Sequence, residues 1–238
     1  MMRRPSRLRV MRPDTLPVNE IFFTIQGEAN WTGSPSVFIR LQGCPVGCPW
    51  CDTKHTWPTA EGGKGQTTFA AIMEKTADTP SPSWAPLTAD DIVGLIEQRW
   101  PDVAHFVITG GEPCLYDLTR LTFLLGERGT VQIETSGTHR IIADQKAWVT
   151  VSPKIKMPGN LPIYREALAR ADEIKMPVVS EGDLELLQHL IARYISASAL
   201  IWVQPVSQDK WATNLCIAAA MEHGWSVSFQ THKYVGLR

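Results

Sequence analysis

Three of the chain's five cysteines lie within eight residues, in the stretch GCPVGCPWCDTKHTW (residues 43–57). Cys44, Cys48 and Cys51 have the spacing C-x3-C-x2-C, and thiolates are soft ligands that suit zinc, copper(I) or iron–sulfur iron. A structural zinc ion needs a fourth ligand, for which His55 is the local candidate. A four-iron cluster held by three thiolates leaves one iron open to a substrate or cofactor. The spacing therefore favours a catalytic iron–sulfur cluster, with structural zinc as the alternative.

The overall composition excludes several classes of protein. The 238-residue chain has 23 basic and 24 acidic residues, so no net charge attracts nucleic acid or membrane lipid. We find no run of about 18 apolar residues that would span a bilayer, and no secretory signal that would favour disulfides. We therefore expect a cytoplasmic protein with metal or redox chemistry at its cysteines, and neither a nucleic acid nor a membrane as partner.

Two segments differ in composition from the rest of the chain. Residues 1–17 carry five arginines and, apart from Asp14, no acidic residue, so we expect a disordered basic tail or translation from an upstream start codon. A single domain should then cover residues 18–238. Within it, residues 58–87 contain EGGKGQTT and DTPSPSWAP around a short helical piece at 68–77, which predicts an irregular insertion.

The elements that must position the cysteines alternate between strands and helices. Apolar, β-branched runs predict strands at 19–26, 36–42, 104–109, 131–135, 148–152, 173–176, 200–204 and 225–230. Helical patterns lie at 88–100, 117–129, 181–194 and 213–224. The strand runs are continuous more than alternating, as in parallel strands covered on both faces. Repeated strand-then-helix units predict a parallel α/β sheet with right-handed crossovers.

Polar or Gly/Pro clusters follow six successive strands at their carboxyl ends. In chain order they are TGGEP, ETSG, SPK, KMP, QPVS and QTHK. Such a series indicates one shared site at the top of a barrel, whereas an open sheet would concentrate its site at one switch point. The chain is short for eight units, so we predict an α/β fold with a partial, incomplete TIM-like barrel of about six β/α units.

The cysteine motif, with the aromatic Trp50 before its third cysteine, resembles the signature of the radical S-adenosylmethionine (SAM) enzymes. In that superfamily three thiolates hold a [4Fe–4S] cluster whose open iron binds SAM, and electron transfer to SAM generates a 5′-deoxyadenosyl radical. The resemblance implies a radical SAM type of barrel and places Trp50 near the adenine. TGGEP resembles the superfamily's glycine-rich SAM-binding segment, which assigns Gly110, Gly111 and Glu112 to SAM. The two glycines would permit close approach of the backbone.

Further segments between Asn19 and Tyr234 resemble one family within that superfamily, the 7-carboxy-7-deazaguanine synthases. They are NEIFFTIQGE, FIRLQGCPVGCPWCDTKHTW, VITGGEP, IETSGT, VSPK, QPVS and SFQTHKY. The resemblance implies a carbon–nitrogen lyase that converts 6-carboxy-5,6,7,8-tetrahydropterin to 7-carboxy-7-deazaguanine with loss of ammonia, in 7-deazapurine and queuosine biosynthesis. It also implies a supporting Mg²⁺ ion, an electron donor such as flavodoxin or ferredoxin, and a homodimer.

The same resemblance assigns the remaining site residues. Those that bind SAM are Glu134, Ser152, Pro153, Lys154, Gln204, Pro205, Val206 and Ser207. Those that bind the substrate are Ile25, Gln26, Gly27, Glu28, Arg40, Thr109, Gln230 and His232. Thr53 matches a magnesium ligand, and a hydroxyl is a hard oxygen ligand of the kind Mg²⁺ takes. The chemistry suits a pterin, because a guanidinium can bind a carboxylate through two N–H groups and amide or carboxylate groups can pair with the ring edge.

Two positions depart from the family's pattern, and two other functions stay open. Ala29 stands where members often have glycine, so a left-handed backbone there would be strained. The chain ends VGLR and not on a proline, so no site is assigned to its last four residues. A radical SAM activase of a partner protein often carries further cysteines, and only Cys114 and Cys216 remain here. A non-catalytic iron–sulfur or zinc protein would cleave no SAM.

Overall fold

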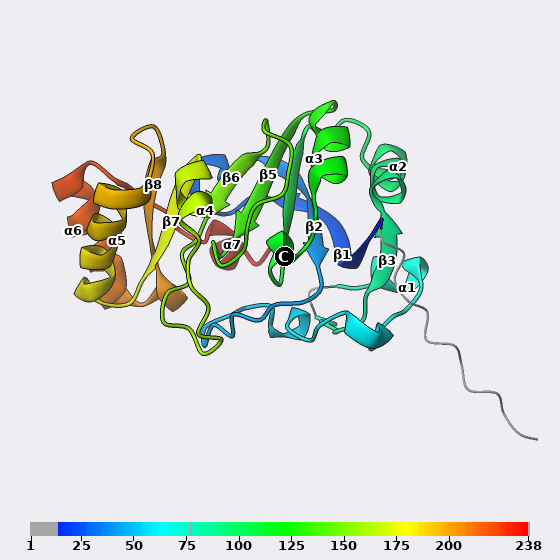
Figure 1. Ribbon diagram of the computed structural model, residues 1–238, viewed down its shortest axis with the longest axis horizontal. Helices are drawn as coiled ribbons and strands as arrows, with labels where there is room; N and C mark the ends of the chain where they lie inside the picture. The colour runs from blue at the N-terminus through cyan, green and yellow to red at the C-terminus, as the bar shows by residue number, and fades with distance from the viewer. Residues whose placement is uncertain (1–13, 77, 238) are drawn as a thin grey trace, which may run out of the picture.

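The computed structural model describes residues 14–76 and 78–237, so residues 1–13 of the predicted tail lie outside the described residues. The described strands form one sheet with the order β3-β1-β2-β4-β5-β6-β7-β8-β9 (Figure 1). Their bounds are Thr15–Ile25 (β1), Pro35–Leu41 (β2), Ala85–Thr88 (β3), His105–Gly110 (β4), Thr130–Thr135 (β5), Trp148–Val151 (β6), Glu173–Val178 (β7), Leu200–Pro205 (β8) and Ser226–Val227 (β9). β1 thus begins three residues before the expected start of the domain at residue 18.

The sheet is parallel from β2 through β4 to β9, whereas β1 pairs antiparallel with both β2 and β3. The parallel part confirms the predicted α/β class with a partial barrel. The antiparallel edge was not predicted. β3 has only four residues and includes Pro86, and its sequence APLT shows no strand-like alternation.

Helices connect most neighbouring parallel strands, although β5 leads to β6 through a loop without a helix. Their bounds are Phe69–Met73 (α1), Ala89–Arg99 (α2), Thr119–Gly126 (α3), Arg165–Arg170 (α4), Glu181–Tyr194 (α5), Lys210–His223 (α6) and Thr231–Val235 (α7). Figure 1 shows α5 and α6 beside β7 and β8 at one end of the molecule, and α2 beside α3 towards the other. α2 begins with a capping box, in which Thr88 and Asp91 exchange hydrogen bonds between side chain and backbone. No helix in the described part of the chain has the length and apolar character needed to cross a membrane.

The segment predicted as an irregular insertion, residues 58–87, is packed against the edge of the sheet. Trp84 is fully buried, and its indole N–H donates to the carbonyl of Lys64 at 2.8 Å. The ammonium of Lys75 donates to the side chain of Asn19 on β1 and to the carbonyl of Ser83. Since β3 pairs with β1, this segment covers an edge that would otherwise expose unpaired backbone groups.

The strands near the middle of the sheet have one apolar and one polar face. Ile133, Val149, Val151, Ile174 and Met176 pack in the apolar clusters of the core. The alternate positions are polar: Gln132, Thr150, Glu173 and Lys175 are buried, and Glu134 is partly buried. Thr150 links its neighbours, because its hydroxyl accepts from Gln132 at 2.9 Å and donates to Glu173 at 2.6 Å. In β5–β7 the strands are therefore covered on both faces but not apolar on both, because the second face carries a hydrogen-bonded polar network.

Candidate active site

The carboxyl ends of the parallel strands surround two adjoining chambers. The cluster chamber, named for its three cysteines, contains residues that lie within or just after each strand from β4 to β9. The side chamber lies between β1, β2 and the cysteine loop. Glu28, Asp52, Thr109 and Glu134 line both chambers and so mark their junction. This is the arrangement expected of one shared site at the top of a barrel.

The structure brings almost all the predicted site residues into these chambers. The predicted residues that line the cluster chamber are Glu28, Cys44, Cys48, Trp50, Cys51, Thr109, Gly110, Gly111, Glu134, Ser152, Lys154, Gln204, Pro205, Val206, Ser207 and Gln230. Those that line the side chamber are Ile25, Gln26, Gly27, Glu28, Arg40, Thr53, Thr109, Glu134 and His232. Glu112 and Pro153 are not among the described residues that line either chamber.

The cysteine loop is held by the glycines that follow β4. The N–H of Gly111 donates to Leu41 at 3.0 Å, and the N–H of Glu112 donates to Gly43 at 2.8 Å. A Cβ atom on Gly111 would lie 2.1 Å from the carbonyl oxygen of Gly43, and one on Gly110 would lie 2.3 Å from that of Leu41. The glycines are therefore needed for close packing of this loop, in addition to any approach of SAM.

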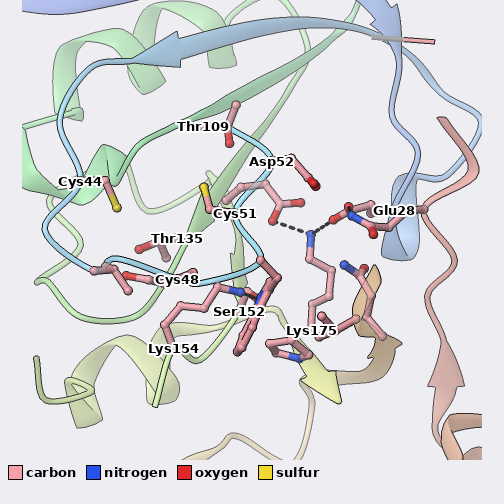
Figure 2. A pocket seen from close by; sticks show the side chains of 18 of the residues that line it. Glu28, Cys44, Cys48, Cys51, Asp52, Thr109, Thr135, Ser152, Lys154 and Lys175 are labelled. Carbon is pink, nitrogen blue, oxygen red and sulfur yellow. Dashed lines mark hydrogen bonds and ion pairs between the residues drawn. The ribbon is translucent and has the colours of Figure 1, made fainter. Parts of the chain in front are cut away.

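The three cysteines fit an iron–sulfur cluster better than a single metal ion. Cys44, Cys48 and Cys51 line the same chamber from one loop (Figure 2). Among the described residues, no three His, Cys, Asp or Glu side chains are grouped so as to hold one ion. The indole N–H of Trp57 donates to the sulfur of Cys51 at 3.4 Å, a contact typical of sulfur ligands to iron clusters.

The carboxylate of Glu112 lies behind the wall of the cluster chamber. It is buried and accepts hydrogen bonds from the backbone N–H groups of Cys114 and Ser136 and from the hydroxyls of Thr135 and Ser136. These donors connect the ends of β4 and β5. Since Thr135 and Ser136 line the cluster chamber, Glu112 positions the residues of that wall and does not face it.

The residues at the ends of β6 and β8 that the resemblance assigns to SAM provide polar groups to the cluster chamber. Lys154 is partly buried, and its ammonium donates to the hydroxyl of Ser152 at 2.5 Å. Burial lowers the pKa of Lys154, while the negative charges of Cys48 and of Glu28 oppose that shift. The hydroxyl of Ser228 donates to the side-chain oxygen of Gln204 at 2.8 Å, and this bond connects β8 to the C-terminal segment.

In the side chamber, Arg40 is held by Glu20 and faces apolar rings. Its Nε donates to Glu20 at 2.6 Å, and its guanidinium lies 5.6 Å from the ring centre of Phe22. Burial lowers the pKa of Arg40 to about 10, so it stays a cation at neutral pH. Glu20 engages Nε, and the fork of the two terminal amino groups is the geometry that binds a carboxylate through two hydrogen bonds.

The loop between β1 and β2 lies across the interior of the barrel. The side chain of Gln26 is buried and donates to Gln132 at 3.0 Å, and the carbonyl of Gly27 accepts from the N–H of Thr231 at the start of α7. Ala29 has a φ of 54°, so the left-handed conformation anticipated at this position is present without a glycine. This loop thus meets the C-terminal segment at the side chamber.

Three charged residues of the site were missed by sequence reasoning: Asp52, Lys175 and Lys233. Asp52 follows Cys51 directly and forms an ion pair of 2.8 Å with Lys233 on α7. Lys175 forms ion pairs with Glu28 and with Glu134, the latter at 2.8 Å. A lysine within the apolar strand EIKM was the one available signal, since an unpaired buried charge is costly and demands a partner.

Burial and charge act in opposite directions on this ion-pair group. Burial would raise the pKa of Glu28, but Lys175 outweighs it and holds that pKa at about 2. Burial raises the pKa of Glu134 to about 7, with support from the negative charge of Glu28 and against the effect of Lys175. Burial would lower the pKa of Lys175, but the two carboxylates raise it.

Comparison with known proteins agrees with this geometry. The model of the radical SAM superfamily matches residues 38–175, which include the three cysteines. The 7-carboxy-7-deazaguanine synthase of Escherichia coli (strain K12) is 46% identical over 93% of this chain and 98% of its own length. This chain belongs to the 7-carboxy-7-deazaguanine synthase family.

A further relative and a solved structure extend the likeness. The 7-carboxy-7-deazaguanine synthase of Buchnera aphidicola subsp. Schizaphis graminum is 41% identical over 93% of this chain and 99% of its own length. The crystal structure of QueE from Escherichia coli superimposes with a TM-score of 0.85 at 44% identity, covering 90% of this chain and 93% of that chain. As in other radical SAM enzymes, the cofactors of a 7-carboxy-7-deazaguanine synthase include a [4Fe–4S] cluster and SAM.

Proposed function

We propose that this chain is a radical SAM lyase that converts 6-carboxy-5,6,7,8-tetrahydropterin to 7-carboxy-7-deazaguanine with loss of ammonia. The observation that carries this proposal is the pair of adjoining chambers. The cluster chamber contains the three thiols and the strand-end residues that the resemblance assigns to SAM. The side chamber contains the guanidinium of Arg40 together with amide and carboxylate groups. The chain is 46% identical to a synthase of that name. The reaction needs a place for the cofactors next to a place for the substrate, and the two chambers offer these.

The cluster chamber would hold the two cofactors. When bound by Cys44, Cys48 and Cys51, a [4Fe–4S] cluster supplies the electron that cleaves SAM to the radical. Trp57 donates a hydrogen bond to Cys51 and stabilises negative charge on that sulfur. Ser152 and Gln204 offer hydroxyl and amide groups that suit the ribose and the methionyl group of SAM.

The side chamber would orient the pterin. Arg40 binds the carboxylate of the substrate through its terminal amino groups, while Gln26 and Glu28 pair with the ring edge. Glu28 is suited to accept N–H groups because Lys175 keeps it ionised. Thr109, at the junction of the chambers, would then lie between the pterin and SAM, which is where hydrogen abstraction must occur.

We further propose that Thr53 supplies a hydroxyl oxygen to Mg²⁺. Thr53 lines the side chamber next to Asp52, so two hard oxygen donors lie where the substrate would bring its own oxygens. Mg²⁺ accepts such a mixed shell and keeps several waters. The contacts of α7, from Thr231 to Gly27 and from Lys233 to Asp52, would reduce the access of water.

The proposal also includes a homodimer, a cytoplasmic location and a one-electron donor such as flavodoxin or ferredoxin. The exposed apolar side chains of Trp211 and Met221 on α6 support a covered surface in the assembly. A radical SAM activase would instead need a protein partner at the chambers.

The decisive experiment is anaerobic turnover of 6-carboxy-5,6,7,8-tetrahydropterin with reconstituted protein, SAM, reductant and Mg²⁺, with the product identified by mass. The deazaguanine should form, and Cys51→Ala should abolish both the product and SAM cleavage. Arg40→Ala should weaken pterin binding more than SAM binding, whereas the exposed Arg120→Ala should change neither. SAM cleavage without the deazaguanine would keep the superfamily and refute the substrate.

A further inference from the structure

Lys175 joins the two chambers. Its side chain is 5% exposed, and its ammonium contacts Glu28 from the loop after β1 and Glu134 from the end of β5. Figure 2 shows this ammonium between the two carboxylates, with Lys175 rising from β7. Three segments far apart in the chain therefore meet at one cation, at the point where the chambers adjoin.

Each carboxylate is also held by an amide, so its direction is fixed. Gln230 donates to the second oxygen of Glu28 at 2.7 Å, and Gln132 donates to the second oxygen of Glu134 at 3.1 Å. Since the amide takes one oxygen and Lys175 takes the other, both carboxylates are oriented by the protein before any ligand binds. Preorganised groups of this kind bind a ligand without further loss of side-chain entropy.

A buried group of one cation and two carboxylates depends on the cation. Removing one partner of a buried ion pair is strongly destabilising, because the other charge stays without compensation. Without Lys175, two carboxylates would face each other in a buried site, and protonation would be the way to relieve the repulsion. The two carboxylates would then share a proton, so together they would accept fewer hydrogen bonds from a ligand than two ionised groups do.

We propose that Lys175 is a positioning residue of the synthase, which keeps Glu28 ionised and fixes Glu28 and Glu134 at the junction between the pterin and SAM. This inference rests on the proposed function, since it concerns how the same site recognises the pterin. Lys175 contacts neither ligand in this role. It acts through the two carboxylates that do.

Other charged groups face the group of Lys175, Glu28 and Glu134, and they define the pH range of a test. Glu173 faces Glu134, His232 on α7 faces Glu28, and Lys154 faces Lys175. Burial lowers the pKa of His232, so it is neutral above its ordinary value of 6.5. Between pH 7 and 9, the wild-type Glu28 is ionised throughout, since its pKa is about 2.

The test is the dissociation constant of 6-carboxy-5,6,7,8-tetrahydropterin, measured anaerobically by calorimetry on cluster-loaded protein between pH 7 and 9. For Lys175→Met we expect binding at pH 7 at least tenfold weaker than in the wild type, with affinity recovering as the pH rises. The sign follows because the raised pKa of the carboxylate pair is crossed on going up in pH. Wild type, Lys175→Arg and the exposed control Lys146→Met should recover at most about twofold, because burial places the pKa of Glu134 at about 7 and Glu134 is already half ionised at pH 7.

The outcomes separate this inference from the proposed function. A Lys175→Met protein whose affinity is unchanged, or is reduced by the same factor at every pH, would overturn the positioning role. Wild-type protein that binds no pterin would instead overturn the proposed function. Should Lys175→Met not fold, Lys175→Gln, which keeps a donor but no charge, carries the same expectation and the same refutation.

Discussion

Replacing Glu112 by glutamine tests whether this buried carboxylate is a structural acceptor or a ligand of SAM. The carboxylate accepts from four donors, among which the backbone N–H groups of Cys114 and Ser136 cannot turn away. Each of these N–H groups donates to a different oxygen. Whichever end of the new side chain becomes the amino group, one backbone N–H must face a donor.

The expected loss follows from that geometry. A hydrogen bond to a charged group contributes about 1.5–3 kcal/mol, and a buried N–H left without an acceptor costs about 1–3 kcal/mol. We therefore expect Glu112→Gln to lower the free energy of unfolding by about 3 kcal/mol. For a chain of this size that corresponds to a melting temperature lower by roughly 6–12 °C. Urea unfolding, followed by tryptophan fluorescence, would measure the free energy of unfolding.

The matched control is Glu97→Gln. Glu97 is half exposed on α2 and pairs with Arg128, so its loss should change the free energy of unfolding by less than about 1 kcal/mol. A Glu112→Gln protein with wild-type stability but much weaker SAM binding would refute the structural role and restore the direct contact with SAM.

Three further predictions concern single side chains. Ala29→Gly should change the free energy of unfolding by less than about 1 kcal/mol. Relief of roughly 1–2 kcal/mol of left-handed strain offsets the lost methyl group and the added entropy of the unfolded chain. The control Ala219→Gly, at a buried helical position, should lower the free energy of unfolding by about 2 kcal/mol in the same urea titration. Burial lowers the pKa of His105 to about 4 from its ordinary 6.5, so the unfolded chain binds more protons between these values and stability should fall as the pH drops from 6.5 towards 4; His105→Gln should flatten that part of the pH–stability curve, and an unchanged slope would contradict the assignment. Trp57→Phe should lower the reduction potential of the reconstituted cluster, measured by an EPR redox titration, because Cys51 loses a hydrogen-bond donor; an unchanged potential would show that the contact has no electronic effect.

The helices that the sequence predicted well are those with local signals at both ends. α5 has the predicted bounds, because an acidic start with a capping box at Ser180 and a basic last turn are readable within 15 residues. α6 starts three residues before the predicted residue 213, because Asp209 caps its first turn. It ends before Gly224, which adopts the left-handed conformation. Such signals need no knowledge of the tertiary structure.

The elements that were missed or shortened depend on distant partners. The strand expected at 225–230 is reduced to Ser226–Val227, because Ser228 turns inward to bond Ala29 and Gln204. Neither contact can be inferred from the residues around it. β3 likewise exists through its pairing with β1, which lies some 70 positions earlier in the chain (Thr15 with Thr88).

The proposal for the cysteines came from the sequence itself. Ligand type, spacing and the missing fourth thiolate are properties of an eight-residue stretch, so this stretch and its resemblance to the radical SAM signature pointed to a cluster at Cys44, Cys48 and Cys51 without a structure. The roles of buried charges were decided only by the tertiary structure. Lys175 lies 147 residues from Glu28 and 41 from Glu134, and Glu112 lies 24 from Ser136. Whether a buried charge binds a ligand or another part of the protein depends on which groups share its low-dielectric surroundings, and folding alone brings those groups together.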